Sequence, residues 1–189
     1  MRVPVPDEMR YLVYTTLAYG AQGISYYVYG HHPGHVGGIA DADGKPTPLY
    51  HALKVLNREF VAIATQLQPL RSLGVYHAGM VPTGTDPLPK DFPFTLDPAV
   101  PAMEYKPATP VKGVLLGCFG PASKTNAVAK PTHVLVVNLD YNSEAVIGLG
   151  GPSRLELFDA TTGKWTSGKR KRVELRLPPG GGKLVRVRR

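Results

Sequence analysis

The sequence contains little cysteine and no long apolar run. Its one cysteine, Cys118, excludes a disulfide bond within the chain. Cys118 stands in the apolar run 113–119, so we expect a buried, inert thiol, because a reactive thiol needs exposure and a neighbour that stabilises the thiolate. No segment reaches the roughly 20 apolar residues of a membrane-spanning helix, and we expect no membrane contact.

Residues 1–20 also lack the apolar core of a signal peptide, because Arg2, Asp7, Glu8 and Arg10 interrupt them. A signal on an upstream extension would leave the same pattern, so the sequence leaves the cellular location open. Charged residues make up 19% of the chain and apolar residues 43%, which excludes a disordered chain. Its 189 residues suffice for one or two domains.

Two helices are predicted in the first third of the chain. The first covers 7–19, with Pro6 in the first turn and Gly20 at the stop, and a buried strand follows over Ile24–Tyr29. The second covers 48–67 and has Thr47 as its cap. Its apolar residues recur at steps of three and four on one face: Leu49, Leu53, Leu56, Phe60, Ile63 and Leu67.

The rest of the chain has the pattern of short strands. Eight prolines among the 32 residues of 79–110 indicate an extended connection, and Leu73–His77 before it reads as a strand. The Pro- and Gly-rich turn 178–182 joins the last two strands. Short runs of Val, Leu and Ile between turns predict an antiparallel sandwich: Val111–Phe119, His133–Asp140, Ala145–Leu149, Arg154–Asp159, Lys171–Leu177 and Lys183–Val187.

Several motifs occur in an order that resembles the last helix–strand–helix of TIM-barrel glycoside hydrolases, especially β-galactosidase-like enzymes with a C-terminal β-domain. The motifs are Pro6–Arg10, Leu17–Tyr27, Asp43–Tyr50, Leu56–Glu59 and Val136–Asp140. The resemblance implies an α+β chain with two domains. Residues 1–70 would be the remnant of a (β/α)8 barrel, and residues 71–189 an antiparallel β-sandwich domain.

The same resemblance implies that this chain carries no catalytic residue. In such enzymes the two catalytic carboxylates follow the fourth and seventh barrel strands, and both positions would lie upstream of Met1. Since hydrolysis with retention needs both carboxyl groups about 5 Å apart, we expect a fragment of a hydrolase that is inactive alone. A separate N-terminal barrel portion would then cover apolar side chains that we expect to be exposed: Leu12, Leu17, Leu53 and Phe60.

Carbohydrate is the partner that the resemblance implies, and the tyrosines near 24–29 are the candidate contacts. In related hydrolases an aromatic ring near this strand end forms a platform for a sugar. Tyr29 is the first candidate and Tyr27 the second, because strand alternation places both on one face and Tyr26 on the other. The alternative is that these tyrosines only pack in a core.

The loop after these tyrosines is rich in histidine. His31 and His32 are candidates for hydrogen bonds to sugar hydroxyls, unless the loop is simply solvated. With His35 they also suggest a metal, but a flexible loop without cysteine or carboxylate is a poor zinc site. Asp41 and Asp43 lack the later acidic ligand of a calcium loop and indicate a turn. We therefore expect neither a metal nor a cofactor.

The net charge is 22 − 14 = +8, and residues 164–189 hold ten basic side chains against the single acid Glu174. In 172–177, charged residues alternate with Val173, Leu175 and Leu177, so the charges should occupy the outer face. Two alternatives to a hydrolase fragment remain: a non-catalytic carbohydrate-binding or structural β-module, or a protein that binds anions or nucleic acid. Because no nucleic-acid motif accompanies the charge, nucleic acid is the less favoured partner.

Overall fold

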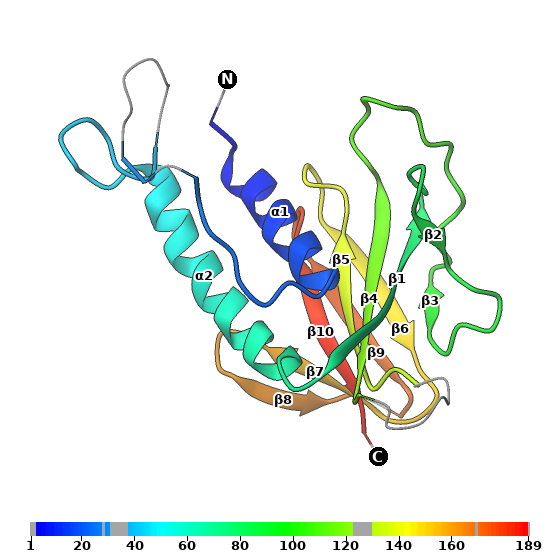
Figure 1. Cartoon of the computed structure of the whole chain (residues 1–189). Helices are drawn as coiled ribbons and strands as arrows, with labels where there is room; N and C mark the ends of the chain where they lie inside the picture. Colours follow the sequence, from blue (N-terminus) through cyan, green and yellow to red (C-terminus); the bar gives the residue numbers. More distant parts are fainter. Residues whose placement is uncertain (1–2, 28, 31–37, 123–129, 169, 189) are drawn as a thin grey trace.

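The structure, a computed structural model, describes residues 3–27, 29–30, 38–122, 130–168 and 170–188. Within these ranges it forms two helices, α1 (Pro6–Ala18) and α2 (Pro48–Leu67), and ten strands (Figure 1). The predicted α+β class is therefore confirmed. Neither of these helices combines the length and the hydrophobicity that crossing a bilayer would require.

Ten strands form two sheets. The larger sheet has the order β2-β1-β4-β5-β10-β7-β8, and the smaller has the order β3-β6-β9. The strands are β1 (Arg71–Gly79), β2 (Asp86–Pro87), β3 (Thr95–Asp97), β4 (Gly113–Gly120), β5 (His133–Asn138), β6 (Ala145–Gly150), β7 (Leu155–Asp159), β8 (Lys164–Ser167), β9 (Arg172–Leu177) and β10 (Gly182–Val187). All neighbouring strands are antiparallel except the short β1–β2 pair.

The central strands of the large sheet are apolar on both faces because both faces are covered. In β5, Leu135 and Val137 belong to a core shared with α1 and α2, whereas Val134 and Val136 belong to a second core shared with β6 and β9. The helices thus cover one face of the large sheet, as Figure 1 shows, and the small sheet packs on the other. Continuous apolar runs are what a strand buried on both faces requires.

Glycine lets α1 lie close to the large sheet. A Cβ at Gly117 of β4 would stand 2.3 Å from the backbone oxygen of Ala18, a separation that no side chain can occupy. The helix is also fixed to α2, because the buried Tyr14 hydroxyl donates to the Glu59 carboxylate at 2.9 Å. Burial, and then the Glu59 charge, raise the pKa of Tyr14.

Both helices end within about one residue of their predicted bounds, and the apolar stripe of α2 faces the core. Thr47 precedes α2 but does not cap it through its side chain. Its hydroxyl donates instead to the backbone oxygens of Gly38 at 2.8 Å and Ile39 at 2.9 Å. The Thr47 side chain therefore secures the preceding segment, and Pro48, which lacks an N–H group, begins the helix.

The predicted strand Ile24–Tyr29 was wrong for the part that the structure describes, since residues 24–27 are irregular and pair with no strand. A strand needs a neighbour for its backbone hydrogen bonds, and none of the described segments lies in that position. The Pro- and Gly-rich turn joins the last two strands, as predicted, although these two strands do not pair with each other. It carries the chain from β9 in the small sheet to β10 in the large one.

The predicted exposure of apolar side chains was wrong for three of the four residues. Leu17, Leu53 and Phe60 are buried in the core between the helices and the large sheet, because α1 and α2 use these faces to pack on the sheet. Leu12 is 51% exposed, as expected. The division into residues 1–70 and 71–189 as separate domains stays a prediction.

Candidate functional site

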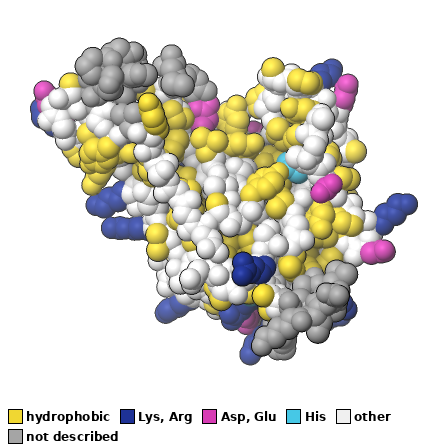
Figure 2. Space-filling view, in the orientation of Figure 1, with side chains coloured by type: hydrophobic (Ala, Val, Ile, Leu, Met, Phe, Trp, Pro, Cys, Tyr) yellow, Lys and Arg dark blue, Asp and Glu magenta, His cyan; other side chains and the backbone are white. Residues whose placement is uncertain are grey.

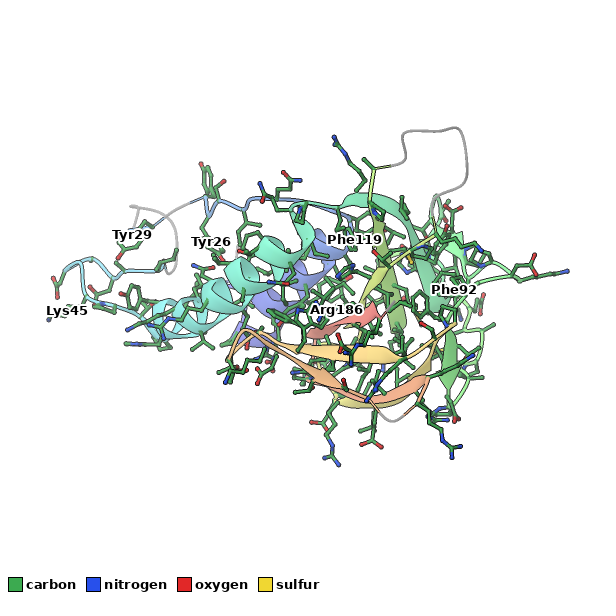
Figure 3. The ribbon with its side chains drawn as sticks, turned by 90° about the horizontal axis from the view of Figure 1, so that it is seen from below. Tyr26, Tyr29, Lys45, Phe92, Phe119 and Arg186 are labelled. Atoms are coloured by element: carbon green, nitrogen blue, oxygen red, sulfur yellow. The ribbon has the colours of Figure 1, made fainter. Side chains whose placement is uncertain are left out.

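A cleft of about 400 Å³ lies between α2 and the segment that leads to it, and its walls are aromatic. Tyr26 and Tyr29 come from that segment, and Tyr50 comes from the first turn of α2. The buried side chains of Ile39 and Leu53 close its base. Figure 3 shows Tyr26 and Tyr29 beside α2, well separated from Arg186. The cleft therefore combines three phenol rings with an apolar floor.

Polar contacts hold one wall of this cleft in place. The Tyr26 hydroxyl donates to Asn57 Oδ1 of α2 at 2.6 Å, and burial raises the pKa of Tyr26. The backbone oxygen of Tyr29 accepts a hydrogen bond from the Ala40 amide at 2.8 Å. Tyr26 and the backbone at residue 29 are thus fixed, whereas the Tyr29 ring is 63% exposed and presents its surface to solvent.

The structure separates the candidates that the sequence brought together. Tyr29 lines the cleft, but Tyr27 is 97% exposed and lines none of it. Tyr26, predicted for the opposite face, shares the cleft with Tyr29, because an irregular segment does not alternate its side chains as a strand does. His31 and His32 lie outside the described residues.

Three further cleft residues were missed in the sequence. Tyr50 and Lys54 stand one turn apart on α2, and Asn57 follows one turn later. This spacing of three and four is the signal that could have found them, since it places all three on one face of a helix. It was overlooked because the apolar stripe of the same helix is stronger.

The turn interpretation of the acidic pair after this segment is confirmed. Asp41 Oδ1 accepts hydrogen bonds from the backbone amides of Asp43 at 3.0 Å and Lys45 at 2.8 Å. One carboxylate oxygen is thereby used to close the turn. Within the described part of the chain, no three His, Cys, Asp or Glu side chains gather as they would around a metal ion.

Glu156 of β7 is the one acidic side chain buried among the described residues, and arginine neutralises it. Arg186 Nε donates to its Oε2 at 2.7 Å, and Arg188 Nη1 lies 3.6 Å from Oε1. The hydrogen bond from Arg186 is the main reason that the pKa of Glu156 is lowered. A general acid in glycoside hydrolysis needs a raised pKa, so this carboxylate does not have the required property.

Six other carboxylates in the described ranges also lie beside basic side chains. The pairs join Asp7 to Arg10, Asp43 to Lys45, Asp97 to Arg172, Glu104 to Lys106, Asp140 to Lys112 and Glu174 to Arg176. These contacts therefore suit surface ion pairs better than proton donors.

Some basic side chains of the C-terminal region take part in contacts that hold the fold together. The Arg186 guanidinium carbon lies 4.2 Å from the centre of the Trp165 ring while its Nε binds Glu156. In β9 the predicted alternation is confirmed, because Val173, Leu175 and Leu177 are buried and the charged residues between them are exposed.

Cys118 is buried, as predicted, and burial raises the pKa of its thiol to about 12. A thiol that remains protonated near neutral pH is a poor nucleophile.

Comparison with protein-family models, with curated proteins and with solved structures finds no match for this chain. What the chain does therefore rests on the chemistry of its own residues.

Proposed function

We propose that this chain is the C-terminal part of a TIM-barrel, β-galactosidase-like glycoside hydrolase, and that it contributes carbohydrate contacts rather than catalytic groups. The observation that carries the proposal is the tyrosine cleft formed by Tyr26, Tyr29 and Tyr50, with Asn57 and Lys54 at its wall. The motif order along the sequence supports the family. In this proposal α1, the segment 21–30 and α2 correspond to the last barrel unit, and the two packed sheets correspond to the sandwich.

The composition of the tyrosine cleft suits a sugar. The C–H face of a pyranose is apolar and packs on an aromatic ring, while its hydroxyls need donors and acceptors at the edge. The exposed Tyr29 offers the aromatic surface for the C–H face. The Lys54 ammonium and the Tyr50 hydroxyl offer hydrogen-bonding groups for the sugar hydroxyls. Ligand sites typically combine such an apolar lining with a few polar groups.

A titration of the full chain with lactose, followed through the ring signals of its tyrosines by NMR, tests the proposal. Tyr29→Ala should weaken binding at least tenfold, which is about 1.4 kcal/mol, because the substitution removes the exposed ring. Tyr27→Ala is the matched control, since this neighbouring tyrosine is outside the cleft, and it should bind as the parent does. Absence of saturable shifts, or equal weakening by both variants, would contradict the proposal.

The alternative of an anion-binding protein has weaker support. Its natural site would be the basic C-terminal region, but Arg186 is occupied by Glu156 and Trp165, and Arg172 forms an ion pair with Asp97. Lys164 of β8 and Arg176 of β9 are exposed on different strands, which suits solvation and discourages edge pairing.

A further inference from the structure

A second hollow lies on the opposite side of α1 from α2, between α1, β1 and the loop before β2. It has a volume of about 750 Å³ and includes Tyr11, Thr16 and Tyr19 from α1 and its end, and His77 and Thr85 from the β1–β2 region. Figure 2 shows the surface hollowed between the part that carries the helices and the loops beside β2 and β4. It shares none of its lining residues with the tyrosine cleft.

His77 is the unusual residue of this groove. It pairs with Leu115 in the β1–β4 register and lies on the face of the sheet that α1 covers. Only 6% of the residue is exposed, and its buried Nδ1 has no hydrogen-bond partner among the residues that the structure describes. Its Nε2 faces the Tyr19 hydroxyl at 3.4 Å, which is long for a hydrogen bond. Neither nitrogen of this buried imidazole therefore makes a short hydrogen bond to the described residues, which is unusual for a buried polar side chain.

The charge state of the groove restricts what could occupy it. Burial lowers the pKa of His77, so its imidazole is neutral at neutral pH and offers one donor and one acceptor. Among the described residues, no lysine, arginine, aspartate or glutamate lines the groove. A charged ligand would lose its hydration there without gaining a counter-charge, so the occupant should be neutral.

The remaining groups restrict the ligand further. Tyr11 and Tyr19 present phenol rings, and the Tyr19 ring is 53% exposed. The Thr85 hydroxyl donates to the Pro82 oxygen at 2.7 Å, which leaves its own oxygen able to accept. Aromatic surface beside neutral donors and acceptors matches a molecule that has an apolar face and several hydroxyls.

We propose that this groove is a second binding site, for a neutral hydroxylated molecule of monosaccharide size, and that His77 is its anchoring hydrogen-bond partner. A ligand hydroxyl bridges His77 Nε2 and the Tyr19 hydroxyl, and gives Nε2 a short hydrogen bond in addition to their long contact. The tyrosine rings pack against the C–H face of the ligand. The inference does not depend on the tyrosine cleft or on the hydrolase assignment.

The test is an NMR titration of the 15N-labelled full chain with galactose, observed at the imidazole nitrogens of His77. We expect saturable shifts in the millimolar range, while the imidazole signals of His51, which is outside the groove, stay constant. Sodium phosphate is the charged control and should not shift the His77 signals in a saturable way. No saturable His77 shift with galactose, or an equal effect of phosphate, would overturn the inference.

His77→Phe, which fills the same space without the nitrogens, should abolish galactose binding in the groove, observed at the ring signals of Tyr11. If that variant does not give a folded spectrum, Tyr19→Phe serves in its place, because it keeps the exposed ring and removes one hydroxyl. It should weaken binding severalfold. Tyr29→Ala should leave galactose binding in the groove unchanged. A negative result for the groove can therefore be told apart from a negative result for carbohydrate binding in the tyrosine cleft. Unchanged affinity in the folded His77→Phe variant, or in Tyr19→Phe used in its place, would refute the role of His77.

Discussion

Glu156 shows how one buried charge organises its surroundings. Arg186 binds it directly and lies on Trp165, and Ser167 donates to it at 3.2 Å. Because Arg186 is itself partly open to solvent, Glu156→Gln should lower the free energy of unfolding at pH 7 by about 1 kcal/mol. Urea denaturation measures this change.

Glu174→Gln is the matched control, because Glu174 is exposed and its contact with Arg176 is long, with 3.9 Å between Oε1 and Nε. It should leave the urea midpoint nearly unchanged. Equal losses in the two variants would show that the buried contact is worth no more than a surface pair.

His133, beside the same cluster, makes stability depend on pH. Burial, and then the positive charge of Arg186, lower its pKa from 6.5 to about 4. Between these values the unfolded chain binds a proton that the folded chain does not, so stability falls as the pH falls from about 6.5 to about 4. His133→Gln should flatten this part of the curve of unfolding free energy against pH. An unchanged slope in the variant would place the acid sensitivity elsewhere.

Individual site residues were only partly predictable from sequence. Tyr29 could be found because tyrosines cluster near it, but Tyr50 and Asn57 are placed beside it by the packing of α2. His77 looked like an ordinary strand residue. That it is buried without a partner at Nδ1 depends on where α1 and β4 lie, which the local sequence does not encode.

At the scale of elements, α1 and the large sheet depend on a residue without a side chain. Gly117→Ala would place a methyl group against the backbone of Ala18, and neither the strand nor the helix can move without disturbing its core. We expect a loss of about 3 kcal/mol, at the upper end for overpacking. Thermal or urea unfolding measures it.

Gly23→Ala is the control for this substitution. A Cβ at Gly23 meets no atom within 4 Å, so the variant should keep the stability of the parent within about 0.5 kcal/mol. If Gly117→Ala were equally harmless, α1 would not pack on β4 as closely as described.

The elements that the sequence predicted well share a physical reason. An apolar stripe and a proline at the first turn determine α2 locally, and the central strands β4 and β5 each contain a continuous apolar run. The strand prediction was wrong for residues 24–27 because a strand also needs a partner strand, which no local pattern supplies. β8 was missed because its four residues are largely exposed and it is held mainly by pairing with β7.

For the whole molecule, we expect no glycosidase activity from this chain alone. The proposed assignment gives it no catalytic carboxyl group, and its buried acid is held ionised by arginine. Purified chain incubated with chromogenic β-galactoside and β-glucoside substrates should release no chromophore above the buffer rate. Glu156→Gln supplies the matched control for trace contamination, since any release should be the same in both preparations. Turnover that follows the chain through purification and is lost in the variant would contradict the expectation.

The position of β10 has a consequence for biosynthesis. This strand, formed by residues 182–187, lies between β5 and β7 in the large sheet, so it joins parts of the chain made much earlier. Until the ribosome has released these residues, β7 and β8 cannot join the large sheet through β10, and the apolar edge of β5 stays open to other chains. Completion of the large sheet must therefore follow translation of residues 182–187, and nascent chains stalled before β10 should depend on chaperones to remain unaggregated.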